Sequence, residues 1–356
     1  MAIVIERYEE FTPEVANQTI GKHFDSPIRE TEILSLGEGV GLMSSIARAR
    51  LTLENGETPT VIVKCVARTD NKELSKGLNF YSNEINFYEY LADETPVPVP
   101  PSLYQAIDPA NQDFLLVLED LGDATAGNQL ESCTADQLNA AFRRAAQLHG
   151  TFWGRCGEFD WLNHQVDMKT ILFRRDAIFR PGIEPCMTGF SEYFTGNRAD
   201  VVNGIAEQYI DLFLNAMGGE PTIVHGDYRT DNMFLVEDDK GEADIIAFDW
   251  QNTMGGNGTH DVAYFCSQSA DSALQASNQM DALRLYHDTL KDYGVNLSFD
   301  ECLDRYRHNL MIVMITPIAI CGTLDQGNER GRQLGATVLE RSLTALEQMD
   351  CAALLK

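Results

Sequence analysis

The spacing of apolar and polar residues near the start of the chain predicts β-strands. Three stretches, residues 32–36, 45–53 and 60–67, are rich in the β-branched and apolar residues that strands favour. Asn55 and Gly56 lie between the second and third stretches, and this pair is a strong signal for a tight turn between antiparallel strands. The sequence therefore predicts a small antiparallel sheet early in the chain.

A helix, a proline-rich segment and a buried strand are expected next. In residues 79–91 apolar positions recur at helical spacing, and the prolines between 96 and 101 end this helix. Residues 114–118 are a continuous apolar run, which is typical of a strand buried on both faces. Residues 119–122 follow directly, and their polar character with a glycine indicates a hinge.

The remainder of the chain reads as mainly helical. Thr134 with Gln137, and Ser298 with Glu301, have the spacing of capping boxes that start helices. Apolar residues at helical spacing also predict a helical segment near the C-terminus. The region is therefore expected to be built from helices.

One hairpin is expected within this helical region. Two short apolar runs, residues 233–236 and 244–248, are separated by a polar segment that ends in Gly241. The order of all these elements indicates an α+β protein with a bilobal, protein-kinase-like arrangement: a small β-rich N-terminal lobe and a larger, mainly helical C-terminal lobe. We expect the first lobe at residues 1–118, the hinge at 119–122 and the second lobe at 123–356.

The composition excludes several classes of protein. Lys and Arg number 27 against 54 Asp and Glu, a formal net charge of −27, so neither nucleic acid nor an anionic membrane is an expected partner. Solubility is favoured over attraction for a cationic substrate as the explanation of this acidity. The nearest two of the eight cysteines are 19 residues apart, which excludes zinc-type spacing and favours reduced thiols. The start of the chain has no signal-peptide pattern and no apolar run reaches the roughly 20 residues of a membrane span, so we expect a soluble cytoplasmic protein.

The segment His225-Gly226-Asp227-Tyr228-Arg229-Thr230-Asp231-Asn232 carries the strongest sign of chemistry. Asp227 and Asn232 precede one strand of the predicted hairpin, and Asp249 follows the other, so the hairpin is expected to bring Asn232 and Asp249 together. A carboxylate and an amide oxygen suit Mg²⁺, while Asp227 can accept the proton of a substrate hydroxyl. Taken singly, Asp227 or Asp249 would more often be a turn or cap residue, but together in this order they favour the functional interpretation.

A glycine-rich loop between the first two predicted strands could approach phosphate groups closely. Its candidates for phosphate contact are Gly37, Gly39, Gly41 and Ser44. The string matches neither the Walker A nor the GxGxxG motif, and a glycine-rich turn without a ligand is the more common explanation.

Lys64 lies in the middle of an otherwise apolar strand, where an unpaired ammonium group would be costly to bury. Glu84, on the helix that follows, is the best candidate for its partner, and Glu73 is a weaker one. Such a pair could aim the ammonium at the phosphates of a nucleotide. A plain ion pair between strand and helix is the alternative.

Together these motifs resemble the aminoglycoside phosphotransferase and choline kinase-like superfamily, most closely its ecdysteroid kinase-like (CHK kinase-like) branch. The HxDxxxxN motif is met by His225, Asp227 and Asn232; the metal-binding aspartate by Asp249; and a downstream structural aspartate by Asp261. The match covers the chain from about residue 36 to 265.

The resemblance implies roles for these residues in an ATP- and Mg²⁺-dependent kinase. Asp227 would be the catalytic base, Asn232 and Asp249 the metal ligands, and His225 and Asp261 the scaffold of the loop. The residues implied in nucleotide binding are Gly37, Gly39, Gly41 and Ser44 in the loop, Lys64 with Glu84, and the backbone of Glu119 and Leu121 at the hinge. Arg229 could neutralise the transferred phosphate, although a surface pairing with Asp231 is nearly as reasonable.

The predicted function is transfer of the γ-phosphate of ATP to a hydroxyl of a small molecule. Asp249-Trp250-Gln251 replaces the Asp-Phe-Gly of protein kinases, and no Ala-Pro-Glu segment follows, which disfavours a protein substrate. The branch favours a hydroxylated apolar acceptor over a choline-type amine or an aminoglycoside. The alternative from another class is a nucleotide-binding pseudokinase without turnover. The sequence gives no indication of the oligomeric state.

Overall fold

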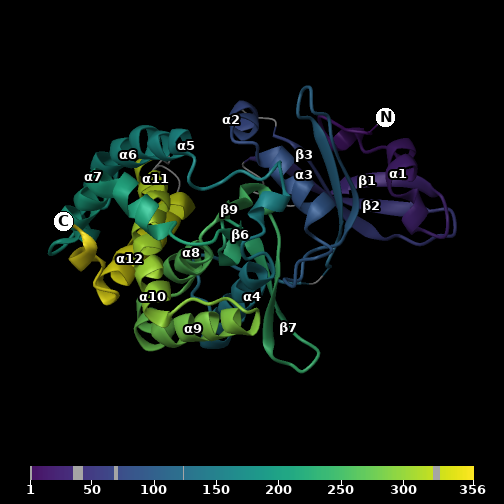
Figure 1. The fold of residues 1–356 in the computed structure, drawn as a ribbon. Coiled ribbons are helices and arrows are strands. Elements are labelled where there is room, and N and C mark those ends of the chain that lie inside the picture. The colour runs from purple at the N-terminus through teal and green to yellow at the C-terminus, as the bar shows by residue number, and fades with distance from the viewer. Residues whose placement is uncertain (1, 35–42, 68–70, 123, 324–328) are drawn as a thin grey trace. The chain divides into compact units, whose positions relative to one another are not determined.

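The computed structural model describes residues 2–34, 43–67, 71–122, 124–323 and 329–356. The chain forms two compact units (Figure 1). The first comprises Met1–Ala124 together with Ala247–Asn252, and the second comprises Thr125–Ile246 and Thr253–Lys356. The short segment 247–252 therefore belongs with the N-terminal unit, although it is distant in the sequence.

An antiparallel five-stranded sheet, in the order β1-β2-β3-β5-β4, forms the centre of the first unit. Its strands are β1 (Ile28–Leu34), β2 (Ser44–Leu53), β3 (Thr60–Val66), β4 (Ser102–Ile107) and β5 (Phe114–Glu119). The turn between β2 and β3 contains Gly56 at φ +90°, a left-handed conformation that explains the glycine there. The predicted hairpin and the central buried strand at 114–118 are thus confirmed. Strand β4 was not predicted, because it is an edge strand that is only half-buried at every position.

Helices α1 (Pro13–Thr19), α2 (Asn71–Gly77) and α3 (Phe80–Tyr90) accompany this sheet (Figure 1). Helix α1 begins at Thr12, whose hydroxyl accepts a hydrogen bond from the amide of Val15. Apolar residues of α1 pack with those of β1, β2, β3 and β5 into one core.

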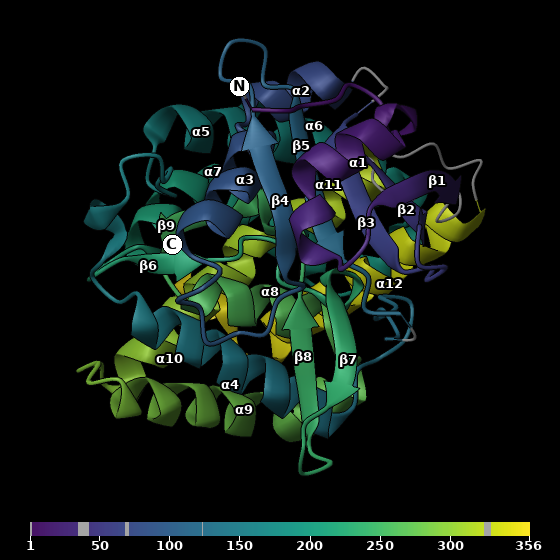
Figure 2. The same ribbon diagram turned by 90° about the vertical axis from the view of Figure 1, so that its right-hand side faces the viewer.

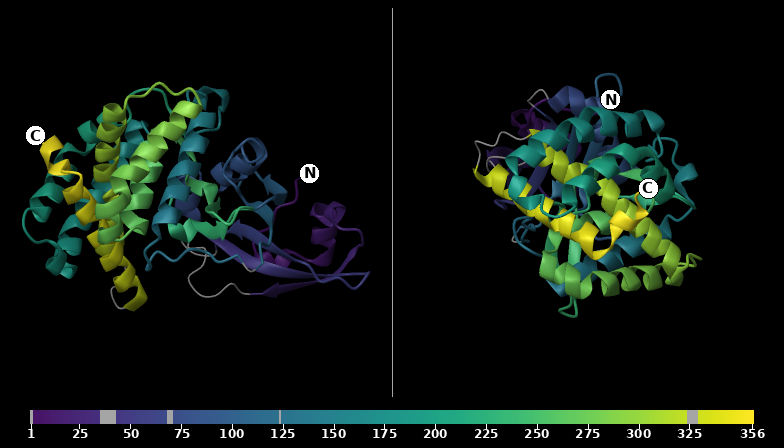
Figure 3. Two further views of the ribbon diagram at one scale, coloured as in Figure 1. Left: turned by 90° about the horizontal axis from the view of Figure 1, so that it is seen from below. Right: turned by 90° about the vertical axis from the view of Figure 1, so that its left-hand side faces the viewer.

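Helices dominate the second unit, as the capping boxes predicted (Figure 3). They are α4 (Ala135–Thr151), α5 (Met168–Phe173), α6 (Arg180–Gly189), α7 (Arg198–Ala216), α8 (Thr259–Ser269), α9 (Ser272–Asp292), α10 (Phe299–Val313), α11 (Ile315–Thr323) and α12 (Glu329–Gln348), with a π-helical turn, η4 (Arg174–Phe179), after α5. Both predicted capping boxes are present, with Thr134 and Gln137 at the start of α4 and Ser298 and Glu301 at the start of α10. Helices α4 and α9 lie side by side (Figure 2).

Two short sheets lie among these helices. The predicted hairpin is formed by β7 (Met233–Glu237) and β8 (Ala243–Ala247), and its two strands run alongside each other in Figure 2. The other sheet pairs β6 (Thr222–Val224) with β9 (Met254–Gly256) and was not predicted, because three-residue strands leave almost no pattern in a sequence. These short strands matter because the segment of candidate catalytic residues connects β6 to β7.

All eight cysteines are free thiols in the structure, and all are buried. Within the described ranges, no helix combines the length and the apolar character that crossing a membrane requires.

Candidate active site

The segment from His225 to Asn232 is fixed by the buried carboxylate of Asp261 at the start of α8. This carboxylate accepts hydrogen bonds from the backbone amides of His225 (2.8 Å) and Gly226 (3.0 Å). Burial by itself would raise the pKa of Asp261, but hydrogen bonding to His149 and nearby imidazoles hold the pKa below its ordinary value. The scaffolding predicted for Asp261 is confirmed by these contacts.

A chain of buried side chains extends this anchor into the helical core. The Nε2 atom of His149, on α4, lies 3.2 Å from Asp261, and its Nδ1 atom lies 3.0 Å from the hydroxyl of Tyr286 on α9. All three side chains are buried. The position of the loop is therefore set by three helices of the second unit.

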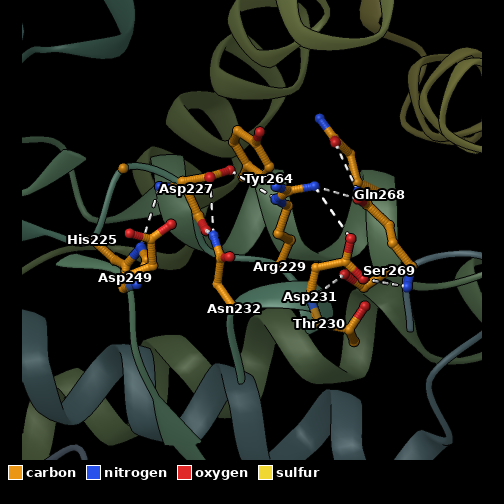
Figure 4. Close-up of polar contacts among 12 residues, drawn as sticks. His225, Asp227, Arg229, Thr230, Asp231, Asn232, Asp249, Tyr264, Gln268 and Ser269 are labelled. Carbon is orange, nitrogen blue, oxygen red and sulfur yellow. Dashed lines mark hydrogen bonds and ion pairs between the residues drawn. The ribbon is translucent and has the colours of Figure 1, made fainter. Parts of the chain in front are cut away.

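Asp227 lies at the centre of this loop and is held in a charged, oriented state (Figure 4). The Nδ2 atom of Asn232 donates to its Oδ2 atom (2.9 Å) and to its backbone carbonyl (2.9 Å). Burial alone would raise the pKa of the Asp227 carboxyl, but the charge of Arg229 and the hydroxyl of Tyr264 favour its ionised form and hold the pKa below its ordinary value. A carboxylate in this state can accept a hydrogen bond, and then a proton, from a substrate hydroxyl.

Arg229 is turned toward Asp227 and is not a free surface side chain (Figure 4). Its Nε atom lies 3.1 Å from the Oδ1 atom of Asp227, whereas its Nη1 atom lies 3.6 Å from Asp231. The side chain is 24% exposed. The pairing with Asp231 considered from the sequence is therefore present, and Arg229 also has a shorter contact with Asp227 that was not predicted.

In the first unit, Lys64 on β3 is held by two carboxylates. Its Nζ atom lies 2.6 Å from Glu84 on α3 and 2.7 Å from Asp249. The predicted ion pair with Glu84 is confirmed, and Glu73 is exposed on α2. Burial raises the pKa of Glu84 to about 7, while the two carboxylates outweigh burial and raise the pKa of Lys64 above its ordinary value.

Local structure around Asp249 explains how it reaches Lys64. Asp249 adopts a left-handed backbone conformation with φ +64°, which is rare for a residue other than glycine. The indole of Trp250 stacks on the ring of Phe87 with centroids 3.8 Å apart, and Gln251 is held by Asn83 and donates to the Oδ2 atom of Asp249 (3.2 Å). Trp250 is thus a core residue that fastens this segment to α3.

The predicted hinge follows the end of β5. The amide of Glu119 donates to Pro101 (2.9 Å), and the carbonyl of Leu121 accepts from Ala124 (3.2 Å). Between them, the carboxylate of Asp120 lies 2.6 Å from Arg48 on β2, and hydrogen bonds and this cation outweigh burial and hold its pKa below the ordinary value. The hinge backbone is therefore tied to the sheet, while its role in binding adenine stays a prediction.

Of the four residues predicted in the glycine-rich loop, the structure describes Ser44. Gly37, Gly39 and Gly41 lie outside the described residues. Ser44 opens β2 opposite Val66 and is buried. The expected approach of Asn232 to Asp249 also stays a prediction, since the two residues belong to different units.

Sequence reasoning did not predict the hydrogen bond from Arg229 to Gln129, or the one from Arg341 to Gln129. Gln129 lies in the segment before α4, and Arg341 lies on α12; neither belongs to a motif. Each is more than 90 residues from Arg229 in the sequence, so no spacing pattern could have connected them. Tyr264 was likewise missed, although it lies three residues after Asp261.

The sequence model of the ecdysteroid kinase-like family matches residues 38–299. The chain belongs to the ecdysteroid kinase-like family. This match includes Lys64, Glu84, Asp227, Asn232 and Asp249 and so covers both groups of residues described above. An ecdysteroid kinase-like protein is a small-molecule phosphotransferase whose acceptor is an alcohol group. A search of curated protein sequences found no match to this ecdysteroid kinase-like chain.

Solved structures similar to this ecdysteroid kinase-like protein are phosphotransferases. A protein of Ralstonia eutropha JMP134, assigned as an aminoglycoside phosphotransferase, is 14% identical with a TM-score of 0.53, covering 95% of this chain and 97% of its own. The GDP and kanamycin complex of APH(2")-IIIa is 11% identical with a TM-score of 0.55, covering 94% and 98%. The amicoumacin kinase hAmiN, in complex with AMP-PNP, Ca²⁺ and Ami, is 12% identical with a TM-score of 0.51, covering 89% and 88%. At these identities the likeness shows the fold, and the predicted kinase-like α+β class is confirmed.

Proposed function

We propose that the protein transfers the γ-phosphate of ATP to a hydroxyl group of a small molecule, with Asp227 as the base. The observation that carries this proposal is the environment of Asp227, whose charged carboxylate is oriented by Asn232 and Arg229 on a loop anchored by Asp261. In the reaction, the acceptor oxygen forms a bond to the γ-phosphorus as the bond from that phosphorus to the β,γ-bridging oxygen breaks. The acceptor proton passes to Asp227, and ADP leaves.

The nucleotide would be oriented by residues of the first unit. Lys64, held by Glu84, would present its ammonium to the phosphates, and the backbone of Glu119 and Leu121 would bind the base. We extend this proposal to Gly37, Gly39, Gly41 and Ser44 as phosphate contacts. Support for nucleotide use comes from similar structures that are complexes with GDP and AMP-PNP. Both groups of residues would act on one nucleotide.

The chemistry of the donor atoms fits a magnesium ion at Asn232 and Asp249. The described hydrogen bonds of the Asn232 side chain are donated by its Nδ2 atom, so its amide oxygen remains suited to a hard cation. Asp249 provides a carboxylate that Lys64 and Gln251 orient. When bound, Mg²⁺ would neutralise the charge that the phosphates carry. Arg229 would add positive charge beside the transferred phosphate.

For the acceptor we propose a hydroxylated apolar compound, ahead of an aminoglycoside or a choline-type amine. Large apolar side chains are exposed on and before α5, namely Val166, Met168, Leu172 and Phe173. Helix α5 continues into η4, which packs against α11. Thr316 of α11 contacts Tyr264, and Tyr264 contacts Asp227. An apolar acceptor would therefore have a compatible surface in the same unit as the base.

The proposal is tested by measuring ADP release from MgATP with a panel of a hydroxysteroid, choline and an aminoglycoside. We expect turnover with at least one acceptor, and the Asp227→Ala variant should lose about a thousandfold in kcat. Its affinity for ATP should remain within about threefold of the wild type. The matched control is Asp239→Ala, which removes an exposed carboxylate from the hairpin between β7 and β8 and should leave kcat unchanged.

Wild-type turnover in the Asp227→Ala variant would remove Asp227 from its role as base. Binding of ATP without phosphorylation of any acceptor would instead support the pseudokinase alternative.

A further inference from the structure

Gln129 is a buried side chain that contacts the charged groups of the catalytic loop. It is 1% exposed and lies between the hinge and α4. Its Oε1 atom accepts a hydrogen bond from the Nη1 atom of Arg229 (2.6 Å), and its backbone amide donates to the carboxylate of Asp231 (2.6 Å). One residue thus contacts both the arginine and the aspartate that follow Asp227 in the loop.

Gln129 is also hydrogen-bonded to one residue of α8 and one residue of α12. Its Nε2 atom donates to the side chain of Gln268 (3.1 Å), which is labelled in Figure 4. The guanidinium of Arg341 donates to the backbone carbonyls of Gln129 (2.7 Å) and Gln268 (2.9 Å). Arg341 is 6% exposed, so these are hydrogen bonds to a buried cation, which are stronger than those between neutral groups.

Two nitrogen atoms of the Arg229 guanidinium have neighbours in this cluster. Nε lies 3.1 Å from the Oδ1 atom of Asp227, an ion-pair contact without hydrogen-bond geometry, and Nη1 donates a hydrogen bond to Gln129 at 2.6 Å. Rotation about the bond between Nε and Cζ leaves Nε in place and moves Nη1, so the hydrogen bond from Nη1 to Gln129 opposes this rotation. The contact of Nη1 with Asp231 is longer, at 3.6 Å, and opposes the rotation less.

We propose that Gln129 is a positioning residue that holds the guanidinium of Arg229 against the base Asp227. This inference rests on the proposed function, in which Arg229 and Asp227 act on the transferred phosphate and the acceptor. A glutamine suits the position because its amide accepts from Arg229 and donates to Gln268 at once. A leucine of similar size would leave both partners without their contact.

The kinetic test compares Gln129→Leu with Gln129→Glu, using the best acceptor of the panel above or, without one, hydrolysis of MgATP. The leucine variant should lose about tenfold in kcat with little change in the KM for ATP. The glutamate variant keeps an acceptor for Arg229 and should recover most of the rate. In an Arg229→Ala background, Gln129→Leu should have no further effect on kcat, because it acts through Arg229. Gln279→Leu is the control, since Gln279 is also 1% exposed but contacts Tyr306.

A second arm needs no activity and so separates this inference from the proposed function. In nitrogen-15 spectra, the Nη1 and Nη2 resonances of Arg229, assigned with an Arg229→Lys variant, should be resolved in the wild type because rotation is blocked. They should merge in Gln129→Leu. Resolved resonances in that variant, unchanged kcat, or an equal loss of kcat in the Arg229→Ala background would each overturn the proposal. Failure of Asp227→Ala to lose activity would count against the proposed function instead.

Discussion

At the scale of single residues, Lys64 has two carboxylates as partners, and their effects on stability should differ. Removing the ammonium leaves Glu84 and Asp249 near each other without a cation, whereas removing the charge of Glu84 leaves Lys64 paired with Asp249. An uncompensated buried charge costs several kcal/mol, and a pair that keeps a partner loses far less. Glu84 is also the more deeply buried carboxylate, with 2% of its side chain exposed.

We therefore predict that Lys64→Met lowers the free energy of unfolding by about 3–5 kcal/mol and that Glu84→Gln lowers it by about 1 kcal/mol or less. Both variants should reduce kcat/KM for ATP by about tenfold or more, because each disturbs the ammonium that we propose as the contact to the phosphates. Urea unfolding and initial-rate kinetics measure the two effects. Equal losses of stability in the two variants would contradict the view that Asp249 compensates for Glu84.

At the scale of elements, Asp261 connects the start of α8 to the loop before β7. Its carboxylate holds two backbone amides and His149, and its pKa lies below the ordinary value. A carboxyl whose pKa is lower in the folded state stabilises the fold above its unfolded pKa of about 4 and loses this effect as the pH falls through its folded pKa.

Accordingly, Asp261→Asn should lower the free energy of unfolding by about 3 kcal/mol at pH 7. The difference from the wild type should begin to shrink below about pH 4, where the unfolded carboxyl takes up a proton, and should be lost only as the pH falls through the lower folded pKa of Asp261. Urea titrations at pH 7 and at about pH 3 measure this, with Asp211→Asn, an exposed site on α7, as the control. A difference that stays constant across this range would show that Asp261 does not act through its charge.

The elements predicted from the sequence were those with strong local signals. The capping boxes at Thr134 and Ser298 and the Asn55-Gly56 turn are complete within a few residues, and the structure has each of them. Strand β4 is half-buried along its length, and β6 has three residues, so neither carries a periodic pattern. The elements that sequence reasoning missed are thus short or lie at an edge.

In the candidate site too, the contacts with a local signal in the sequence were predicted and the contacts without one were missed. The pair of Lys64 with Glu84 was predicted because a lysine in an apolar strand requires a partner nearby. Gln129 and Arg341 were not, because their contacts with the loop depend on how α8, α12 and the segment before α4 pack. A neutral glutamine has no motif and no charge that would single it out in a sequence.

At the scale of the whole molecule, the chain divides its candidate chemistry between two compact units. The proposed base Asp227 and the arginine beside it belong to the second unit, and Lys64, Glu84 and Asp249 belong to the first. Residues 247–252 belong to the first unit, although they follow β8 of the second unit in the sequence. Asp249 in this segment can therefore pair with Lys64 on β3. Our account requires both groups to act on one phosphoryl group.

Phosphorus NMR of the purified protein with MgATP and the hydroxylated acceptors tests this requirement most directly. The account predicts that the γ-phosphate resonance of ATP declines while a phosphate monoester resonance of the acceptor grows in equal amount. Loss of ATP with only inorganic phosphate as the product, or no change in ATP that is bound to the protein, would contradict it.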